Sequence, residues 1–292
     1  MERLISMEVK NSLVNKESKQ TFSAFLATDA MKKKINEMVG GKDGQQFITA
    51  IISAVSTNPQ LAECENSSIV SAALLGQALK LSPSPQLGQY YIVPFNNSDR
   101  GCKVAQFQLG YKGYIQLAIR SGQYKKINVL AIKEGELIEY DQLNEEIKVN
   151  LIEDEELREQ AETIGYYAMF EYMNGFRKTI YWTKQKMEAH ALKYSKGYKA
   201  KKGYTFWEKD FDGMAYKTML RQLISKWGIM SVDMQTAMEK DMAVIKENGD
   251  YEYIDNNSNE IDVVSNEKSN EEKVEIQENV NDKKKEYEDP FL

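Results

Sequence analysis

The 292-residue sequence predicts an α+β fold, in which helices pack on antiparallel strands. Apolar residues recur at helical spacing near both ends of the folded part, and strand-like segments lie between them. Asn174-Gly175 joins two of those segments, and Asn-Gly is the strongest short signal for a β-hairpin. We therefore expect antiparallel hairpins covered by helices.

Three helices are expected before the first strand. They cover about residues 21–38, 45–55 and 68–81, and the last of them has Asn66 as a candidate N-cap and Pro83 as a stop signal. Their apolar residues indicate packing elements rather than a site.

Strand signals follow in residues 89–95 and 103–109, which are separated by turn residues and form the first expected hairpin. The second strand alternates apolar residues with Gln106 and Gln108, so it predicts one apolar face and one wet face that carries amides. The later elements are a helix at 111–121, a strand at 127–132, a carboxylate-rich segment through residue 156, a hairpin of 164–172 with 176–182, and helices at 184–194, 206–227 and 233–247.

Charge is segregated along the chain, although the whole carries a formal net charge of -6. Residues 241–292 hold 16 acidic and 6 basic residues, whereas residues 1–240 hold 32 basic and 28 acidic residues. After Gly249 too few apolar residues remain to offset an ordering entropy of about 1 to 2 kcal/mol per residue. We expect a flexible arm at 1–20, one folded domain at 21–248 and a disordered acidic tail at 249–292.

Several classes of function lack their sequence signatures. Cys64 and Cys102 form no CxxC pair and His190 is the only histidine, so neither a zinc site nor a disulfide framework is expected. The sequence has no Walker-type phosphate loop, no nucleophile elbow and no apolar run long enough for a membrane span. The acidic residues at 134–146 could hold metal ions for a nuclease, but acidic hairpins are usually only solvated. We expect a cytoplasmic protein that is not an enzyme and uses no cofactor.

Two segments combine cations with aromatic rings, a composition typical of single-stranded DNA binding. Residues 176–227 carry 13 Lys or Arg against 4 Asp or Glu, and residues 100–126 carry 6 against none. The alternative for each is a solvated segment whose rings pack on the core. The candidate DNA contacts in these segments are Tyr111, Lys112, Arg120, Lys201, Lys202, Tyr204 and Trp207.

The helix expected at 206–227 is apolar over most of its circumference, yet Lys217 and Arg221 lie four residues apart on one side. A buried cation without an anionic partner is costly, so a negative group must meet them. Asp210 is too far along the helix to form an i,i+4 pair with Lys217. Two partners remain open: a DNA phosphate, or a carboxylate elsewhere in the fold.

Four motifs between about residues 22 and 240 resemble, in order, the RecT-type recombinases of phages and prophages. They are Phe107–Ala118 (FQLGYKGYIQLA), Tyr181–Thr183 (YWT), Asp212–Arg221 (DGMAYKTMLR) and Ser225–Gly228 (SKWG). The resemblance implies a curved antiparallel sheet packed by helices, as in other single-strand annealing proteins, with DNA in a positive groove. The positions that it marks as DNA contacts are Gln108, Tyr111, Lys112, Lys217, Thr218 and Arg221.

The resemblance also implies an ATP-independent protein that binds single strands and anneals them in recombination. Its implied partners are single-stranded DNA, the annealed duplex, further copies of the chain in a ring or filament, an exonuclease and the single-strand-binding protein of a bacterial host. The last is suggested by the acidic end Glu288–Leu292, which resembles the tails of such proteins. The alternative function is a replication accessory that protects single strands without annealing them.

Overall fold

The structure of the chain is a computed structural model that describes residues 21–97, 101–246 and 251–252. The arm expected at 1–20 and the tail from residue 253 onward lie outside the described residues. Tyr251–Glu252 forms a short strand, β9, within the segment expected to be disordered. Among the described helices, none combines the length and the apolar character needed to cross a membrane.

The first part of the chain is helical, as predicted, but with different boundaries. The helix expected at 21–38 is two helices, and Asn66 is the first residue of its helix rather than the cap, which is Glu65. The break in the first helix falls where the Thr28 hydroxyl donates to the Phe25 carbonyl. These elements are α1 (Phe22–Leu26), α2 (Asp29–Val39), α3 (Gly41–Thr57), the 3-10 helix η1 (Pro59–Glu63) and α4 (Asn66–Ala78).

The first predicted hairpin is confirmed as β1 (Tyr90–Asn97) and β2 (Cys102–Leu109), with α4 packed against it. The prediction of a wet face on β2 is wrong, because Gln106 and Gln108 are only 3% and 8% exposed. Their amides are accommodated by bonding to each other, with Gln108 Nε2 at 3.5 Å from Gln106 Oε1.

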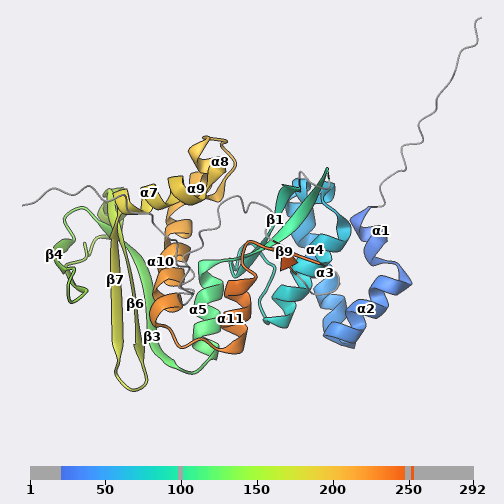
Figure 1. Cartoon of the computed structure of the whole chain (residues 1–292), viewed down its shortest axis with the longest axis horizontal. Helices are drawn as coiled ribbons and strands as arrows, with labels where there is room; N and C mark the ends of the chain where they lie inside the picture. Colours follow the sequence, from blue (N-terminus) through green and yellow to red (C-terminus); the bar gives the residue numbers. More distant parts are fainter. Residues whose placement is uncertain (1–20, 98–100, 247–250, 253–292) are drawn as a thin grey trace, which may run out of the picture. The chain divides into compact units, whose positions relative to one another are not determined.

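A second, three-stranded antiparallel sheet has the order β3 (Tyr124–Lys133), β6 (Thr163–Tyr172), β7 (Arg177–Thr183). The predicted Asn-Gly hairpin is confirmed, and Gly175 adopts the positive φ of 87° that its turn requires. The long helix α10 (Phe211–Trp227) contacts all three strands and also packs against α5 (Tyr111–Arg120), while α7 (Lys184–Tyr194) packs on β6 and β7 (Figure 1). The α+β prediction is therefore confirmed.

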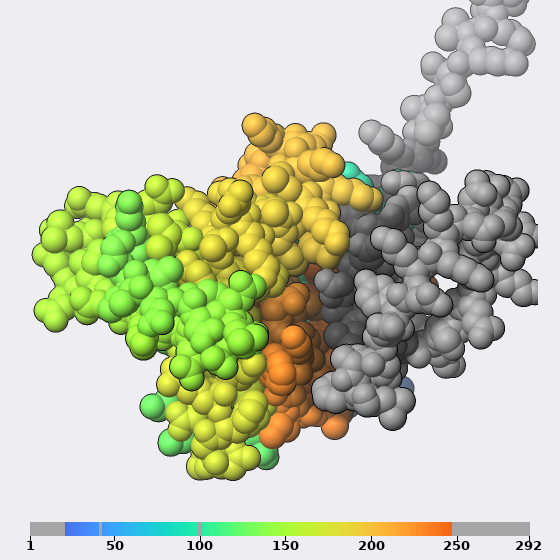
Figure 2. Space-filling view, turned by 60° about the vertical axis from the view of Figure 1, so that its left-hand side comes forward, coloured from blue at the N-terminus to red at the C-terminus, as the bar shows by residue number. Residues whose placement is uncertain are grey.

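The carboxylate-rich segment forms a hairpin of β4 (Leu137–Asp141) and β5 (Glu146–Val149), followed by the short helix α6 (Glu155–Gln160). Figure 2 shows this green segment on the surface beside the yellow strands of the sheet. Its buried carboxylate, Glu136, is bound by Arg158 rather than aimed at a common centre with other acids. No group of three or more potential metal ligands occurs among the described residues.

Two predicted helices near the end of the domain are wrong in extent. The helix expected at 206–227 is α9 (Phe206–Lys209) followed by α10, because the Asp210 carboxylate accepts from the Gly213 backbone N–H and starts a new helix. The helix expected at 233–247 is α11 (Val232–Glu239) only, and a turn with the strand β8 (Val244–Ile245) follows it.

Buried tyrosines predict alkaline unfolding. Burial raises the pKa of Tyr90, Tyr114 and Tyr166 above the ordinary 10.0 of a phenol. A phenol whose pKa is higher in the folded than in the unfolded chain gives stability that is complete below the unfolded pKa and is lost as the pH rises above it. We expect the free energy of unfolding to fall above about pH 10, with tyrosinate absorbance and loss of the helical circular dichroism rising together. Titration of all tyrosines with the helical signal intact would contradict this.

Candidate nucleic-acid interface

The candidate interface is built around the start of α5, where the chain passes very close to the loop before β1. A Cβ atom on Gly110 would overlap the Gly88 carbonyl, and one on Gly113 would overlap the Gln89 carbonyl. Only glycine allows this approach, because the neighbouring atoms are backbone and cannot move aside. The two glycines thus position Tyr111 beside the loop.

Two adjoining clefts run along the outer side of α5 and share Ile115. The smaller, of about 280 Å³, lies between α5 and the loop before β1; the larger, of about 450 Å³, lies between α5 and β3. Among the described residues no carboxylate lines either cleft. Their polar lining consists of amides, lysines and phenols: Gln86, Gln89, Lys112, Gln116, Tyr124, Lys125, Lys126, Asn128 and Tyr167.

The positive charge of the two lysines in the larger cleft is partly neutralised by a carboxylate on β6. The Glu171 carboxylate lies 2.5 Å from Lys125 Nζ and 4.0 Å from Lys126 Nζ, and the Lys125 ammonium holds the pKa of Glu171 below its usual value. Lys112 in the smaller cleft is exposed and lies 5.9 Å from the ring of Tyr111. The Lys112 ammonium is therefore accessible from the smaller cleft, and its contact with a phosphate stays a prediction.

Aromatic rings connect this surface to the predicted binding loop. The ring of Tyr91 lies 5.5 Å from that of Phe206 at the start of α9, and Tyr111 lies 5.5 Å from Tyr216. Burial, followed by the nearby Asp210 carboxylate, raises the pKa of Tyr91. A Cβ atom on Gly110 would lie 3.2 Å from the Tyr91 ring, so this ring lies between the start of α5 and the start of α9.

The predicted loop contacts fall into two groups. Lys201, Lys202 and Tyr204 are exposed between α8 (Lys196–Lys199) and α9, and Tyr204 is 62% exposed. Trp207 is only 7% exposed, and its ring lies 5.1 Å from that of Phe211. Trp207 therefore packs in the core, which is the alternative to DNA contact for the rings of this segment. The DNA contacts of the other three residues stay predictions.

Three other predicted contacts are engaged inside the chain. Arg120 donates to the carbonyls of Leu79 and Lys80 at 2.6 and 3.3 Å, so it binds the end of α4. Thr218 donates to the Met214 carbonyl of its own helix, and Gln108 is buried. Their side chains have structural partners, and their contacts with DNA remain predictions.

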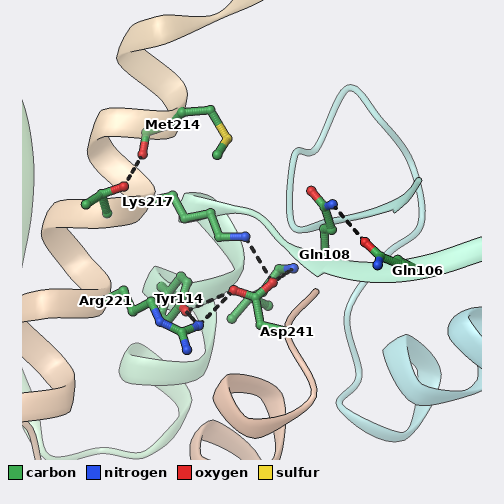
Figure 3. A network of polar contacts seen from close by, with 9 residues as sticks. Gln106, Gln108, Tyr114, Met214, Lys217, Arg221 and Asp241 are labelled. Carbon is green, nitrogen blue, oxygen red and sulfur yellow. Dashed lines mark hydrogen bonds and ion pairs between the residues drawn. The ribbon is translucent and has the colours of Figure 1, made fainter. Parts of the chain in front are cut away.

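Lys217 and Arg221 converge on Asp241, a carboxylate from the turn after α11 (Figure 3). Lys217 Nζ lies 2.9 Å from Oδ1 and Arg221 Nη1 lies 3.0 Å from Oδ2. The Leu109 backbone N–H donates to Oδ1 at 2.9 Å, and the Asp241 side chain is fully buried. Of the two partners that the sequence left open, the carboxylate is the one observed, and the phosphate contact stays a prediction.

The burial of this cluster explains its electrostatics. Desolvation lowers the pKa of Lys217, and the Asp241 carboxylate opposes that shift by favouring the charged ammonium. Arg221 also reaches the Tyr114 hydroxyl at 3.4 Å, so the cluster joins α5 to α10.

The sequence did not predict the role of Asp241, nor the glutamine amides that line the two clefts. Asp241 was hidden in the helix expected at 233–247, although the β-branched Val244 and Ile245 favour a strand and so a break before them. Gln86, Gln89 and Gln116 carry no sequence signal of their own, because glutamine is common on any surface.

The Asp241 cluster predicts a large and specific loss of stability. Asp241→Asn keeps the size of the side chain but leaves the buried Lys217 ammonium without its counter-ion, so we expect the free energy of unfolding in urea to fall by about 3 to 5 kcal/mol. Asp233→Asn, in the exposed first turn of α11, is the matched control and should cost less than about 1 kcal/mol. Equal losses for the two variants would contradict the assignment.

Comparisons with known proteins identify the family of the chain. A model of the RecT family matches residues 45–259. An uncharacterized protein of Bacillus subtilis, YqaK, is 39% identical over 279 residues, which cover 92% of this chain and 90% of the relative. Protein RecT of Escherichia coli is 29% identical over 199 residues, which cover 68% of this chain and 71% of the relative. The chain belongs to the RecT family.

Proposed function

We propose that this chain anneals complementary single strands of DNA without ATP or a metal ion, as an oligomeric recombination protein in the cytoplasm of a bacterial host. Membership of the RecT family supports a role in recombination and annealing. The observation that carries the proposal furthest is the pair of clefts along α5, which no carboxylate of the described part of the chain lines, because a polyanion is repelled by acidic linings.

The clefts suit a strand of any sequence. Lysines such as Lys112 neutralise phosphates, and this contact carries no sequence information. The exposed rings of Tyr204 and Phe206 offer faces on which bases stack, again irrespective of sequence. A strand held by its backbone keeps its pairing edges available to a complement, which is the requirement for annealing.

The proposed partners are single-stranded DNA, the annealed duplex and further copies of this chain in a ring or filament. An exonuclease that exposes single strands and the host single-strand-binding protein complete the proposed set. Neither of these two proteins is needed for the annealing step itself.

The experiment that tests the proposal measures the pairing rate of two complementary fluorescent oligonucleotides, with and without the full chain, in EDTA and without ATP. We expect acceleration. Tight binding without acceleration would instead support the protective accessory, and strand cleavage on restoring Mg²⁺ would support a nuclease.

Lys112→Ala should weaken binding equally for oligonucleotides of different sequence, because a phosphate contact is lost. The slope of log K against log salt should become shallower by about 0.7, the value for one phosphate of a single strand. Lys33→Ala removes a comparably exposed lysine, paired with Glu37 on α2, and serves as the control. A slope unchanged by Lys112→Ala, or changed equally by both variants, would remove Lys112 from the interface.

A further inference from the structure

The loop before β1, residues 79–89, is attached to α5 at both of its ends. At the end next to β1, the Gly110 N–H of α5 donates to the Gln89 carbonyl at 2.9 Å. Between the two ends, Gln86 and Leu87 line the smaller cleft from the side of the loop. The shape of this cleft therefore depends on how each end of the loop is held.

Arg120, in the last turn of α5, holds the other end of the loop. Its Nη2 donates to the Leu79 carbonyl at 2.6 Å and its Nη1 donates to the Lys80 carbonyl at 3.3 Å. These carbonyls directly follow α4, where the end of a helix leaves acceptors unpaired and favours a positive charge. Lys80 also has a φ of 53°, which is unfavourable for a residue other than glycine. The guanidinium thus binds two carbonyls of a strained turn.

Arg120 shares a side of α5 with residues of the smaller cleft. Lys112 and Gln116 line the cleft and precede Arg120 by eight and four residues, and residues four apart lie on one side of a helix. The Arg120 side chain itself lines neither cleft, because its guanidinium is bound to the end of α4. It therefore lies next to the candidate DNA site and not in it.

Hydrogen bonds within the loop connect this attachment to the wall of the cleft. The Ser82 N–H donates to Gln89 Oε1 at 2.7 Å, and the Ser84 N–H donates to Ser82 Oγ at 3.2 Å. The Leu87 N–H donates in turn to the Ser84 carbonyl at 3.1 Å. A change where the loop leaves α4 is thus transmitted to Leu87 and Gln89, which line the cleft.

We propose that Arg120 is a positioning residue of the candidate DNA site, which preorganises the loop 79–89 as a wall of the smaller cleft without contacting the strand. Preorganisation strengthens binding, because the loop then needs no ordering when the strand enters. The inference rests on the proposed function. It gives Arg120 a role other than the DNA contact predicted from the sequence.

Arg120→Ala in the full chain is tested first without DNA. The variant lacks both hydrogen bonds to the end of α4, so we expect amide hydrogen exchange in peptides covering residues 79–89 to be about tenfold faster than in wild type. Exchange in the sheet of β3, β6 and β7 should stay as in wild type, because Arg120 is exposed at the end of its helix. Unchanged exchange in the loop, or equal acceleration throughout the chain, would overturn the proposal.

Binding of a short oligonucleotide is the second measurement. Arg120→Ala should bind about five- to tenfold more weakly than wild type, because the strand must now order the loop. The slope of log K against log salt should not change, whereas loss of a phosphate contact would make it shallower by about 0.7. Saturating oligonucleotide should restore slow exchange in the loop of the variant. Wild-type affinity, or a slope shallower by that amount, would contradict the positioning role.

Arg120→Lys separates the charge of this side chain from its geometry. Lysine keeps the positive charge, but its single ammonium does not span two carbonyls as the planar guanidinium does. We expect loop exchange and affinity between those of wild type and Arg120→Ala. Lys33→Ala, on α2, is again the control and should leave both unchanged. If Arg120→Lys matches wild type in both measurements, charge alone is sufficient and the proposal is wrong.

The two measurements also separate this inference from the proposed function. A wild-type chain that binds no oligonucleotide would overturn the proposed function and the inference together. Weaker binding by Arg120→Ala with unchanged exchange in the loop would overturn the inference alone, and it would return Arg120 to the predicted DNA contacts.

Discussion

Burying a carboxylate is costly unless both of its oxygens are ion-paired or hydrogen-bonded. The oxygens of Asp241 have such contacts from three separate elements. Lys217 and Arg221 come from α10, and the Leu109 N–H comes from the end of β2. The Tyr114 hydroxyl of α5 lies 3.5 Å away. One anion thus joins the first hairpin, the helix of the candidate interface and the helix that covers the second sheet.

For the proposed binding of DNA, this arrangement changes which cations can supply the positive charge. Two of the cations that looked best suited to phosphate in the sequence are neutralised from within, and Arg120 is occupied by the end of α4. In the proposed function, the charge left for a strand comes from exposed lysines on α5 and in the loop before α9, because Glu171 partly neutralises the lysines at the start of β3. Such side chains are long and solvated, which is compatible with the proposed binding of strands of any sequence and their release after pairing.

The sequence predicted the elements whose signals are local. Asn174-Gly175 set the β6–β7 hairpin, and α7 begins and ends at the predicted residues, with the Thr183 side chain as its cap. Features that depend on distant contacts were not predictable. The burial of Gln106 and Gln108 and the partner of Lys217 are decided by residues far away in the chain, and no periodicity reports them.

The predicted helix ends were wrong for a related reason. Asp210 interrupts an apolar pattern that continues unchanged through α9 and α10, and the periodicity therefore predicted one helix where the capping carboxylate makes two. In the same way, the family could be inferred from motifs, whereas the clefts on which the proposed function rests could not. The clefts are made by packing between α5 and two other segments. Only Gly110 and Gly113, the two glycines of the motif, indicate this close packing in the sequence.

The position of Asp241 also bears on the order in which the chain can fold during synthesis. Lys217 and Arg221 are synthesised before their counter-ion, so burial of α10 is costly until the turn after α11, which contains Asp241, has been made. A nascent chain that ends before residue 241 holds every helix that the structure describes, yet it carries two cations that must stay in water. The domain is therefore completed from its C-terminal end, and its final docking waits for a single acidic residue.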